Sequence, residues 1–276
     1  MPSTSPFPLV ISHDRCLVVG AGSGIGRAVA LELARLGVTV YAAGRRVNKL
    51  EQTRDLAGGG RVVPVHCDVR DQAAVDAMFR FIEADGGPVP AIVNSAANPV
   101  YSPAANLTPQ AFDDAIGWSV IGGFKLLHHW GLALMNAGLT GAAVTLTSAV
   151  CARGCPGVAH SSAGKAGLES LTKTLAREWG PNGLRLNVIG VGAFPVEKSM
   201  ELWADPDLGA RMRDQIALGR FGRLEEIVGP ILFLLSDSAS YVTGHVLQVE
   251  GGTRTTNWPI PAAKISQGLN NKYDAG

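Results

Sequence analysis

The sequence has few charged residues and no excess of either sign. Only 17% of its 276 residues are Asp, Glu, Lys or Arg, and the formal net charge is +1. Proteins that bind nucleic acids or anionic membranes usually carry a basic surface, so we expect neither kind of partner. Because 46% of the residues are hydrophobic, disorder is excluded and a large buried core is expected.

Cysteines, long apolar runs and targeting signals are also scarce. The four cysteines form no Cys-x-x-Cys pair, which argues against a disulfide framework. His128 and His129 have no partners at metal-ligand spacing, so we expect no metal. The longest apolar run, around residues 231–235, is far shorter than a membrane-spanning helix requires. No secretory or peroxisomal signal is recognisable, and we expect a cytoplasmic protein.

Short apolar strands alternate with amphipathic helices along the chain. The expected strands cover residues 16–19, 39–43, 61–66, 91–94, 142–147, 186–189 and 246–249, and the expected helices cover residues 25–36, 47–56, 72–84, 109–136, 160–179 and 225–235. Strands joined by helices predict a doubly wound α/β fold, a parallel sheet with helices on both faces. We expect a single domain, with a core at about residues 14–252, a substrate lid at 190–222 and a C-terminal tail at 253–276.

A glycine-rich segment, Gly20 to Gly26, follows the first expected strand and opens the first expected helix. Glycines there allow a tight turn and a close approach to a pyrophosphate, whose charge the helix N-terminus stabilises. An ordinary glycine-rich turn is the alternative, and the strand–turn–helix context argues against it. The sequence therefore predicts a dinucleotide site that uses Gly20, Ser23, Gly24, Ile25 and Gly26.

Two arginines follow the second expected strand, where NAD-specific enzymes place an acidic residue. Arg45 and Arg46 suit a ribose 2′-phosphate because guanidinium groups match its charge and geometry. We therefore expect NADPH as the cofactor, with solvated arginines at a helix start as the alternative. After the third strand, Asp68 and Val69 are expected to contact the adenine, and the alternative for Asp68 is to cap the next helix.

Further motifs complete a pattern that resembles the short-chain dehydrogenase/reductase family over about residues 14–252. The motifs are Asn94-Ser95-Ala96-Ala97, Lys165-Ala166-Gly167, Arg185-Leu186-Asn187-Val188 and Tyr241-Val242-Thr243-Gly244. The resemblance implies a single Rossmann-type domain with seven parallel strands, hydride transfer to or from nicotinamide, and commonly a homotetramer. It also implies that Asn94, Ala96 and Lys165 contact the cofactor.

The active site of that family uses Asn, Ser, Tyr and Lys, and two of these four differ here. Aligned on Lys165, the tyrosine position is Ser161. The serine position is Ser148, and the asparagine position is Ser119. A serine hydroxyl is far less acidic than a phenol, whose pKa is near 10, so it is a poor terminal acid. Ketone reduction is then expected to lose general acid catalysis, worth about 10²–10⁴-fold.

Reduction of a conjugated carbon–carbon double bond explains the loss of the tyrosine better. Hydride then lands away from the oxygen, and the charge that develops on that oxygen needs hydrogen-bond donors and a cation. The pattern is similar to the 2,4-dienoyl-CoA reductases of the family, which have a small residue at the tyrosine position. The first hypothesis is therefore an NADPH-dependent reductase of an enoyl- or 2,4-dienoyl-CoA-like thioester.

Two other hypotheses remain open. The second is a ketone or imine reductase with a substitute proton donor, for which the candidates are Tyr101, His160 and a water held by Ser119, Ser148 and Ser161. The third is a non-catalytic NADP-binding protein. Turnover of ketones that depends on Tyr101 would favour the second, and cofactor binding without turnover would favour the third.

Overall fold

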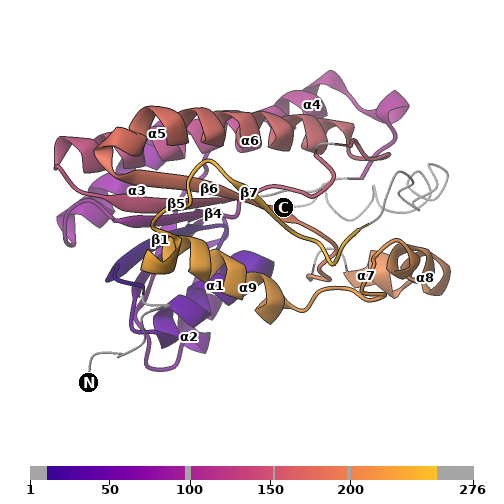
Figure 1. The fold of residues 1–276 in the computed structure, drawn as a ribbon, viewed down its shortest axis with the longest axis horizontal. Helices are drawn as coiled ribbons and strands as arrows, with labels where there is room; N and C mark the ends of the chain where they lie inside the picture. The colour runs from indigo at the N-terminus through magenta and orange to yellow at the C-terminus, as the bar shows by residue number, and fades with distance from the viewer. Residues whose placement is uncertain (1–10, 97–100, 152, 198–199, 254–276) are drawn as a thin grey trace.

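Seven parallel strands form one sheet in the order β3-β2-β1-β4-β5-β6-β7 (Figure 1). This computed structural model describes residues 11–96, 101–151, 153–197 and 200–253. The strands are β1 (Arg15–Val19), β2 (Thr39–Gly44), β3 (Val62–His66), β4 (Ala91–Asn94), β5 (Gly141–Leu146), β6 (Leu184–Val191) and β7 (Val246–Val249). The predicted Rossmann-like parallel sheet is thus confirmed.

Helices cover both faces of this sheet (Figure 1). They are α1 (Gly24–Arg35), α2 (Val47–Leu56), α3 (Gln72–Ala84), α4 (Pro109–Ile116), α5 (Gly122–Asn136), α6 (Ala159–Trp179), α7 (Met200–Ala204), α8 (Pro206–Asp214) and α9 (Leu224–Leu235). Buried side chains of α1, α2 and α9 pack on one face, and those of α3, α5 and α6 pack on the other. In the described part of the chain, no helix is long and apolar enough to cross a membrane.

The strands read as unbroken apolar runs because both sides of the sheet are buried. On β1, Cys16 and Val18 face the α1 and α9 layer, whereas Leu17 and Val19 face the α3, α5 and α6 layer. All four side chains are buried. A sheet with one solvated face would instead show alternating polar residues.

The strand order reverses beside β1, which lies between β2 and β4. In such sheets a crevice opens outside the carboxyl ends of the strands at the point of reversal. The segments that follow β1 to β6 are therefore brought to one edge of the molecule.

The motif Arg185-Leu186-Asn187 anchors the far end of the sheet. The guanidinium of Arg185 donates to the carbonyl oxygens of Leu234 and Ala239, each at 2.9 Å, at the end of α9. Asn187 Nδ2 donates to the carbonyl oxygen of Val242 at 2.8 Å. These side chains satisfy carbonyls that a helix end and a tight connection leave without partners.

The helix expected over residues 109–136 is interrupted. A π-helical turn, η2 (Gly117–Ile121), separates α4 from α5. At Gly122 a Cβ atom would lie 2.7 Å from a methyl carbon of Val69, so the helix passes too close to the loop after β3 for a side chain there. The glycines thus allow close packing at this point.

The connection at 190–222 includes the helices α7 and α8, which were not among the helices expected from the sequence. Helix α8 begins where the Asp205 carboxylate accepts from the N–H of Leu208 at 2.8 Å, and Pro206 occupies the first turn. An aspartate cap followed by proline is a helix-start signal that the sequence reading overlooked.

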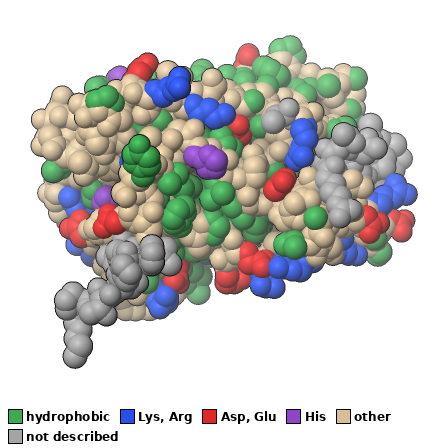
Figure 2. All heavy atoms as spheres, in the orientation of Figure 1, with side chains coloured by type: hydrophobic (Ala, Val, Ile, Leu, Met, Phe, Trp, Pro, Cys, Tyr) green, Lys and Arg blue, Asp and Glu red, His purple; other side chains and the backbone are tan. Residues whose placement is uncertain are grey.

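Figure 2 shows the molecule as spheres in the same orientation. Charged side chains of both signs are scattered over the face in view, and hydrophobic side chains gather along its middle, between α6 and α9. The described part of this face therefore carries no broad area of one charge sign.

Candidate active site

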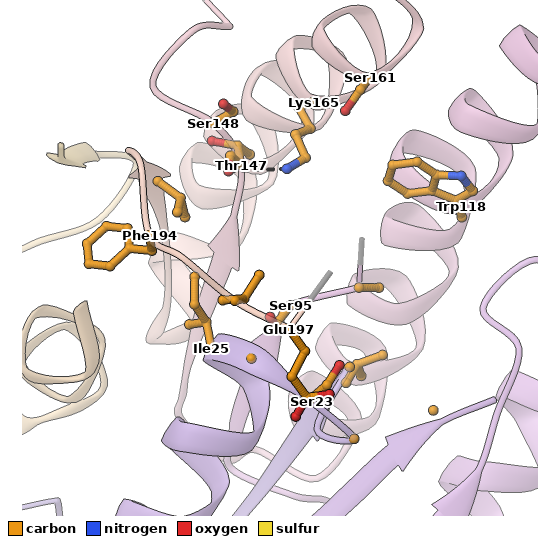
Figure 3. A pocket seen from close by; sticks show the side chains of 18 of the residues that line it. Ser23, Ile25, Ser95, Trp118, Thr147, Ser148, Ser161, Lys165, Phe194 and Glu197 are labelled. Atoms are coloured by element: carbon orange, nitrogen blue, oxygen red, sulfur yellow. Dashed lines mark hydrogen bonds between the residues drawn. The ribbon is translucent and has the colours of Figure 1, made fainter. Parts of the chain in front are cut away.

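A cavity of about 340 Å³ lies across the carboxyl ends of the strands. Segments that follow β1, β2, β3, β4, β5 and β6 contribute to its wall, as Figure 3 shows from close by. Ligands of open α/β sheets bind at this edge, so the cavity is the candidate active site.

The glycine loop between β1 and α1 forms one end of the cavity. Gly20 and Gly24 have φ values of +83° and +53°, which favour glycine. A Cβ atom on Gly20 would lie 2.6 Å from the carbonyl oxygen of Ser95, so no side chain fits there. Helix α1 begins at Gly24, and Ser23 makes no side-chain cap hydrogen bond. The loop and the first N–H groups of α1 therefore fit a pyrophosphate.

Two arginines border the same end of the cavity directly after β2. Arg45 and Arg46 line the cavity and are exposed. Nη2 of Arg46 donates to Oγ of Ser23 at 3.2 Å, so this guanidinium lies beside the glycine loop. No acidic residue stands at 44–46 to accept from a ribose hydroxyl. The charge at this position fits a phosphorylated ribose.

Asp68 and Val69 line the cavity at the end of β3. The Asp68 carboxylate accepts from Nη2 of Arg70 at 2.7 Å and from the backbone N–H of Arg70 at 3.0 Å. The Arg70 guanidinium therefore lowers the pKa of Asp68. Helix α3 is capped by Asp71, which accepts from the N–H of Ala73 at 2.9 Å. The alternative that Asp68 caps this helix is wrong.

The segment after β4 contributes backbone and small side chains to the cavity. Ser95 and Ala96 line the wall. Asn94 is buried behind them, and its Oδ1 accepts from the N–H of Ala96 at 3.2 Å. Asn94 thus shapes the turn that Ala96 presents to the cavity. A direct contact between Asn94 and the cofactor stays a prediction.

Ser148, Ser161 and Lys165 line the other end of the cavity, and their catalytic roles stay predictions. Ser148 follows β5, whereas Ser161 and Lys165 lie four residues apart on α6 and share one face of this helix. Nζ of Lys165 donates to the carbonyl oxygen of Thr147 at 3.4 Å. Burial lowers the pKa of Lys165, and the neighbouring Cys151 raises it to a smaller extent. The three side chains offer two hydroxyl groups and one amine to a ligand.

The other three candidate catalytic residues lie in different surroundings. Tyr101 lines the cavity and packs against Val150, Cys155 and Val158. Ser119 is buried in η2, and its hydroxyl donates to the carbonyl oxygen of Ala115 in the preceding turn. His160 is buried on α6. Ser119 and His160 are not among the described lining residues, and catalytic roles for them stay predictions.

The sequence reading missed several residues of the cavity wall. Among them are Trp118, Ser162, Arg70, Glu197 and Thr253. Trp118 precedes Ser119 in η2, where the π turn departs from the 3.6-residue period of a regular helix. Helical periodicity is therefore a poor guide to which residues of this segment face the cavity. No group of three His, Cys, Asp or Glu that could hold a metal occurs within the described ranges.

Comparison with known proteins shows which family the chain belongs to. A family model described as enoyl-(acyl carrier protein) reductase matches residues 20–254. The chain belongs to the short-chain dehydrogenase/reductase family. It is 34% identical to a probable 2,4-dienoyl-CoA reductase of Caenorhabditis elegans, over 87% of this chain and 80% of the relative. It is 33% identical to gluconate 5-dehydrogenase of Gluconobacter oxydans, over 88% of this chain and 95% of the relative.

A solved structure from Beutenbergia cavernae, a putative NAD(P)-dependent gluconate 5-dehydrogenase with bound NADP, has the same fold. It aligns with a TM-score of 0.81 and 32% identity, over 89% of this chain and 98% of that chain. The protein is accordingly an NAD(P)-dependent oxidoreductase of the short-chain family. Its relatives act on different substrates, so the family alone does not name the substrate.

Proposed function

We propose that this protein is an NADPH-dependent reductase of a carbon–carbon double bond conjugated to a carbonyl, such as that of an enoyl- or 2,4-dienoyl-CoA-like thioester. The observation that carries the proposal is the serine at position 161. It stands one helical turn before Lys165 on the cavity wall, where the family pattern places a tyrosine as the acid.

Reduction of a conjugated carbon–carbon double bond and reduction of a ketone differ in what happens at the carbonyl oxygen of the substrate. When bound, NADPH supplies a hydride. In a conjugated system the carbon that accepts hydride is remote from the oxygen, and the oxygen gathers negative charge that donors and a cation stabilise. Ser148 and Ser161 supply donors, and Lys165 supplies the charge. An alcohol product instead requires a proton on the oxygen, which serine delivers far less readily than a phenol with a pKa near 10.

The cavity wall beyond these residues favours an apolar acyl group. It includes Val150, Val158, Phe194 and Trp203. A polyol or a sugar acid would lose hydration against these mainly apolar side chains, which is costly where no hydrogen bond replaces it. This argues for a substrate like that of the dienoyl-CoA reductase relatives rather than one like gluconate.

Cofactor selectivity is the second part of the proposal. Arg45 and Arg46 border the cavity after β2 and place positive charge where the 2′-phosphate of NADPH is expected. The adenine is expected beside Asp68 and Val69, and the pyrophosphate over the glycine loop.

We also propose that residues 190–222 form a lid over the substrate. Phe194 and Trp203 belong to this connection and line the cavity. Nη1 of Arg27, on α1, lies 3.1 Å from Oε1 of Glu197 and ties the connection to the cofactor side. A homotetramer remains our expectation for the assembly. It is motivated by the edge strand β7, which pairs only with β6 among the described strands, and by the exposed apolar residues Leu218 and Tyr241.

A substrate panel tests the proposed function. With NADPH, we expect 2-enoyl- or 2,4-dienoyl-CoA thioesters to be reduced, and saturated ketones of matched chain length to react about 10²–10⁴-fold more slowly. The measurement is kcat/KM for each substrate, followed by NADPH absorbance. Absence of NADPH oxidation with every thioester would contradict the proposal.

The second candidate, a ketone or imine reductase, is favoured by the position of Tyr101 on the cavity wall. Under this alternative, ketones or imines turn over faster than thioesters, and Tyr101→Phe removes the activity. Tyr241→Phe is the matched control, because Tyr241 is fully exposed. Ketone turnover that survives Tyr101→Phe would rule out Tyr101 as the donor.

A further inference from the structure

Glu169 lies on the same face of α6 as Ser161 and Lys165, because residues four apart on a helix stack above one another. Its side chain is half-buried, and it is not among the described residues that line the cavity. It therefore occupies the turn of α6 directly behind the proposed reaction centre.

The carboxylate of Glu169 lies against the turn that carries Ser148. Oγ1 of Thr147, one residue before Ser148, donates to Oε1 of Glu169 at 2.8 Å. The thiol of Cys151, three residues after Ser148, lies close enough to Glu169 for the carboxylate to raise its pKa. An ionised carboxylate only accepts hydrogen bonds, so the hydroxyl of Thr147 is the donor in this contact.

Thr147 contacts both this carboxylate and Lys165, which is half-buried. Its hydroxyl is bound to Glu169, and its carbonyl oxygen accepts from Nζ of Lys165 at 3.4 Å. Its N–H donates to the carbonyl oxygen of Ile189 at 2.9 Å and continues the β5–β6 ladder beyond the end of β5. The segment that carries Ser148 is thus fixed to β6 by its backbone and to α6 by Glu169.

We propose that Glu169 is a positioning residue, which holds the turn Thr147–Cys151 against α6 so that Ser148 stays opposite Ser161 and Lys165. This inference rests on the proposed function, in which these three groups stabilise charge on the substrate oxygen. Such donors must be held within a few tenths of an ångström of their working positions. A shift of about 1 Å can cost about 10²-fold in rate.

Activity measurements test whether Glu169 acts through Ser148. Glu169→Gln keeps the size of the side chain but removes the acceptor-only carboxylate, and we expect kcat to fall about tenfold while KM for NADPH stays within about twofold. Thr147→Val should cause a similar loss, whereas Thr147→Ser, which keeps the hydroxyl, should retain activity. In a Ser148→Ala background, Glu169→Gln should change kcat less than about twofold, because the positioned group is already absent.

Glu178→Gln is the matched control for this series. Glu178 lies on the same helix and is exposed, so this variant should behave as the wild type. If Glu169→Gln lowers kcat by the same factor with and without Ser148, Glu169 does not act through Ser148 and the inference is overturned. A loss that appears only in KM for NADPH would overturn it as well.

The thiol of Cys151 gives a second test that needs no turnover. The pKa of Cys151 is raised to about 11, chiefly by burial; the charge on Glu169 contributes to the rise, whereas the backbone of Ser148 and the charge of Lys165 oppose it. Glu169→Gln should therefore lower this pKa, and alkylation of Cys151 should speed up at a fixed pH below it. Cys155, whose pKa burial raises to about 12, serves as the internal control.

The two tests separate failure of the inference from failure of the proposed function. If no thioester or ketone is reduced but alkylation of Cys151 responds to Glu169→Gln, the contact stands and the proposed reaction is wrong. If the enzyme is active but Cys151 alkylation has the same pH dependence in the wild type and in Glu169→Gln, Glu169 does not hold this turn and the inference is overturned.

Discussion

Replacing Lys165 by methionine is expected to lower kcat for reduction by about 10²–10³-fold, the usual loss when one group that stabilises developing charge is removed. Nζ of Lys165 lies on the cavity wall and donates to the carbonyl oxygen of Thr147. Methionine fills a similar volume and carries no charge. The loss should appear in the reduction of the thioester, measured as NADPH oxidation under saturating cofactor.

The pH dependence of kcat should differ between the wild type and Lys165→Met. Burial lowers the pKa of Lys165 below its ordinary value of 10.5. The ammonium needed for charge stabilisation is therefore lost as the pH rises through this lowered pKa, and kcat should decline on the alkaline side. Lys165→Met should lack this decline, because no group remains at that position to lose a proton.

Stability measurements control for unfolding of this variant. Since the folded pKa of Lys165 is depressed, the buried ammonium destabilises the protein without cofactor at every pH below that folded pKa. The cost vanishes as the pH approaches the ordinary value of 10.5. Lys165→Met should thus be no less stable than the wild type at neutral pH. Lys173 is an exposed lysine on the same helix, and Lys173→Met should leave kcat unchanged. Retention of wild-type kcat in Lys165→Met would contradict the role assigned to Lys165.

Removal of both arginines after β2 is the second change with a large expected effect. Each hydrogen bond to a charged group contributes about 1.5–3 kcal/mol. Because Arg45 and Arg46 are exposed, we expect their contributions to lie at the low end of this range. We expect the double variant, Arg45→Ala with Arg46→Ala, to raise the Kd for NADPH about 10²-fold. The Kd for NADH should change less than about threefold, because NADH lacks the 2′-phosphate.

Titration of cofactor fluorescence measures both dissociation constants. Arg54→Ala is a suitable control, since Arg54 is exposed further along α2 and pairs with Asp55 at 2.9 Å. Added salt should weaken NADPH binding more than NADH binding in the wild type, because the discriminating contacts are exposed charges. Equal losses for the two cofactors in the double variant, or tighter binding of NADH by the wild type, would contradict NADPH selectivity.

The sheet and the glycine loop could be predicted because local sequence determines them. Strands buried on both faces are short apolar runs, and Cys16 to Val19 is one such run with all its side chains buried. The loop could be recognised because Gly20 and Gly24 adopt positive φ values, which favour glycine, and the sequence therefore shows a glycine at each of these positions. That Ser161 and Lys165 share one face of α6 followed from their spacing of four residues.

Other features depend on contacts that sequence spacing does not encode. Trp118 lines the cavity from the π turn η2, whereas the next residue, Ser119, is bound to its own helix. Arg70 holds Asp68, and Glu169 holds Thr147 from a segment 22 residues away. The sequence did not identify these partners, because several other charged residues could equally have bound Asp68 or Thr147.

The central claim is that a hydroxyl and an ammonium suffice here because hydride reaches a carbon remote from the oxygen. An α,β-unsaturated ketone presents both sites in one molecule, and deuterium-labelled NADPH marks the carbon that receives the label. Mass spectrometry or NMR of the product should find deuterium on the β-carbon of a saturated ketone. Deuterium on the carbonyl carbon of an allylic alcohol would contradict this account.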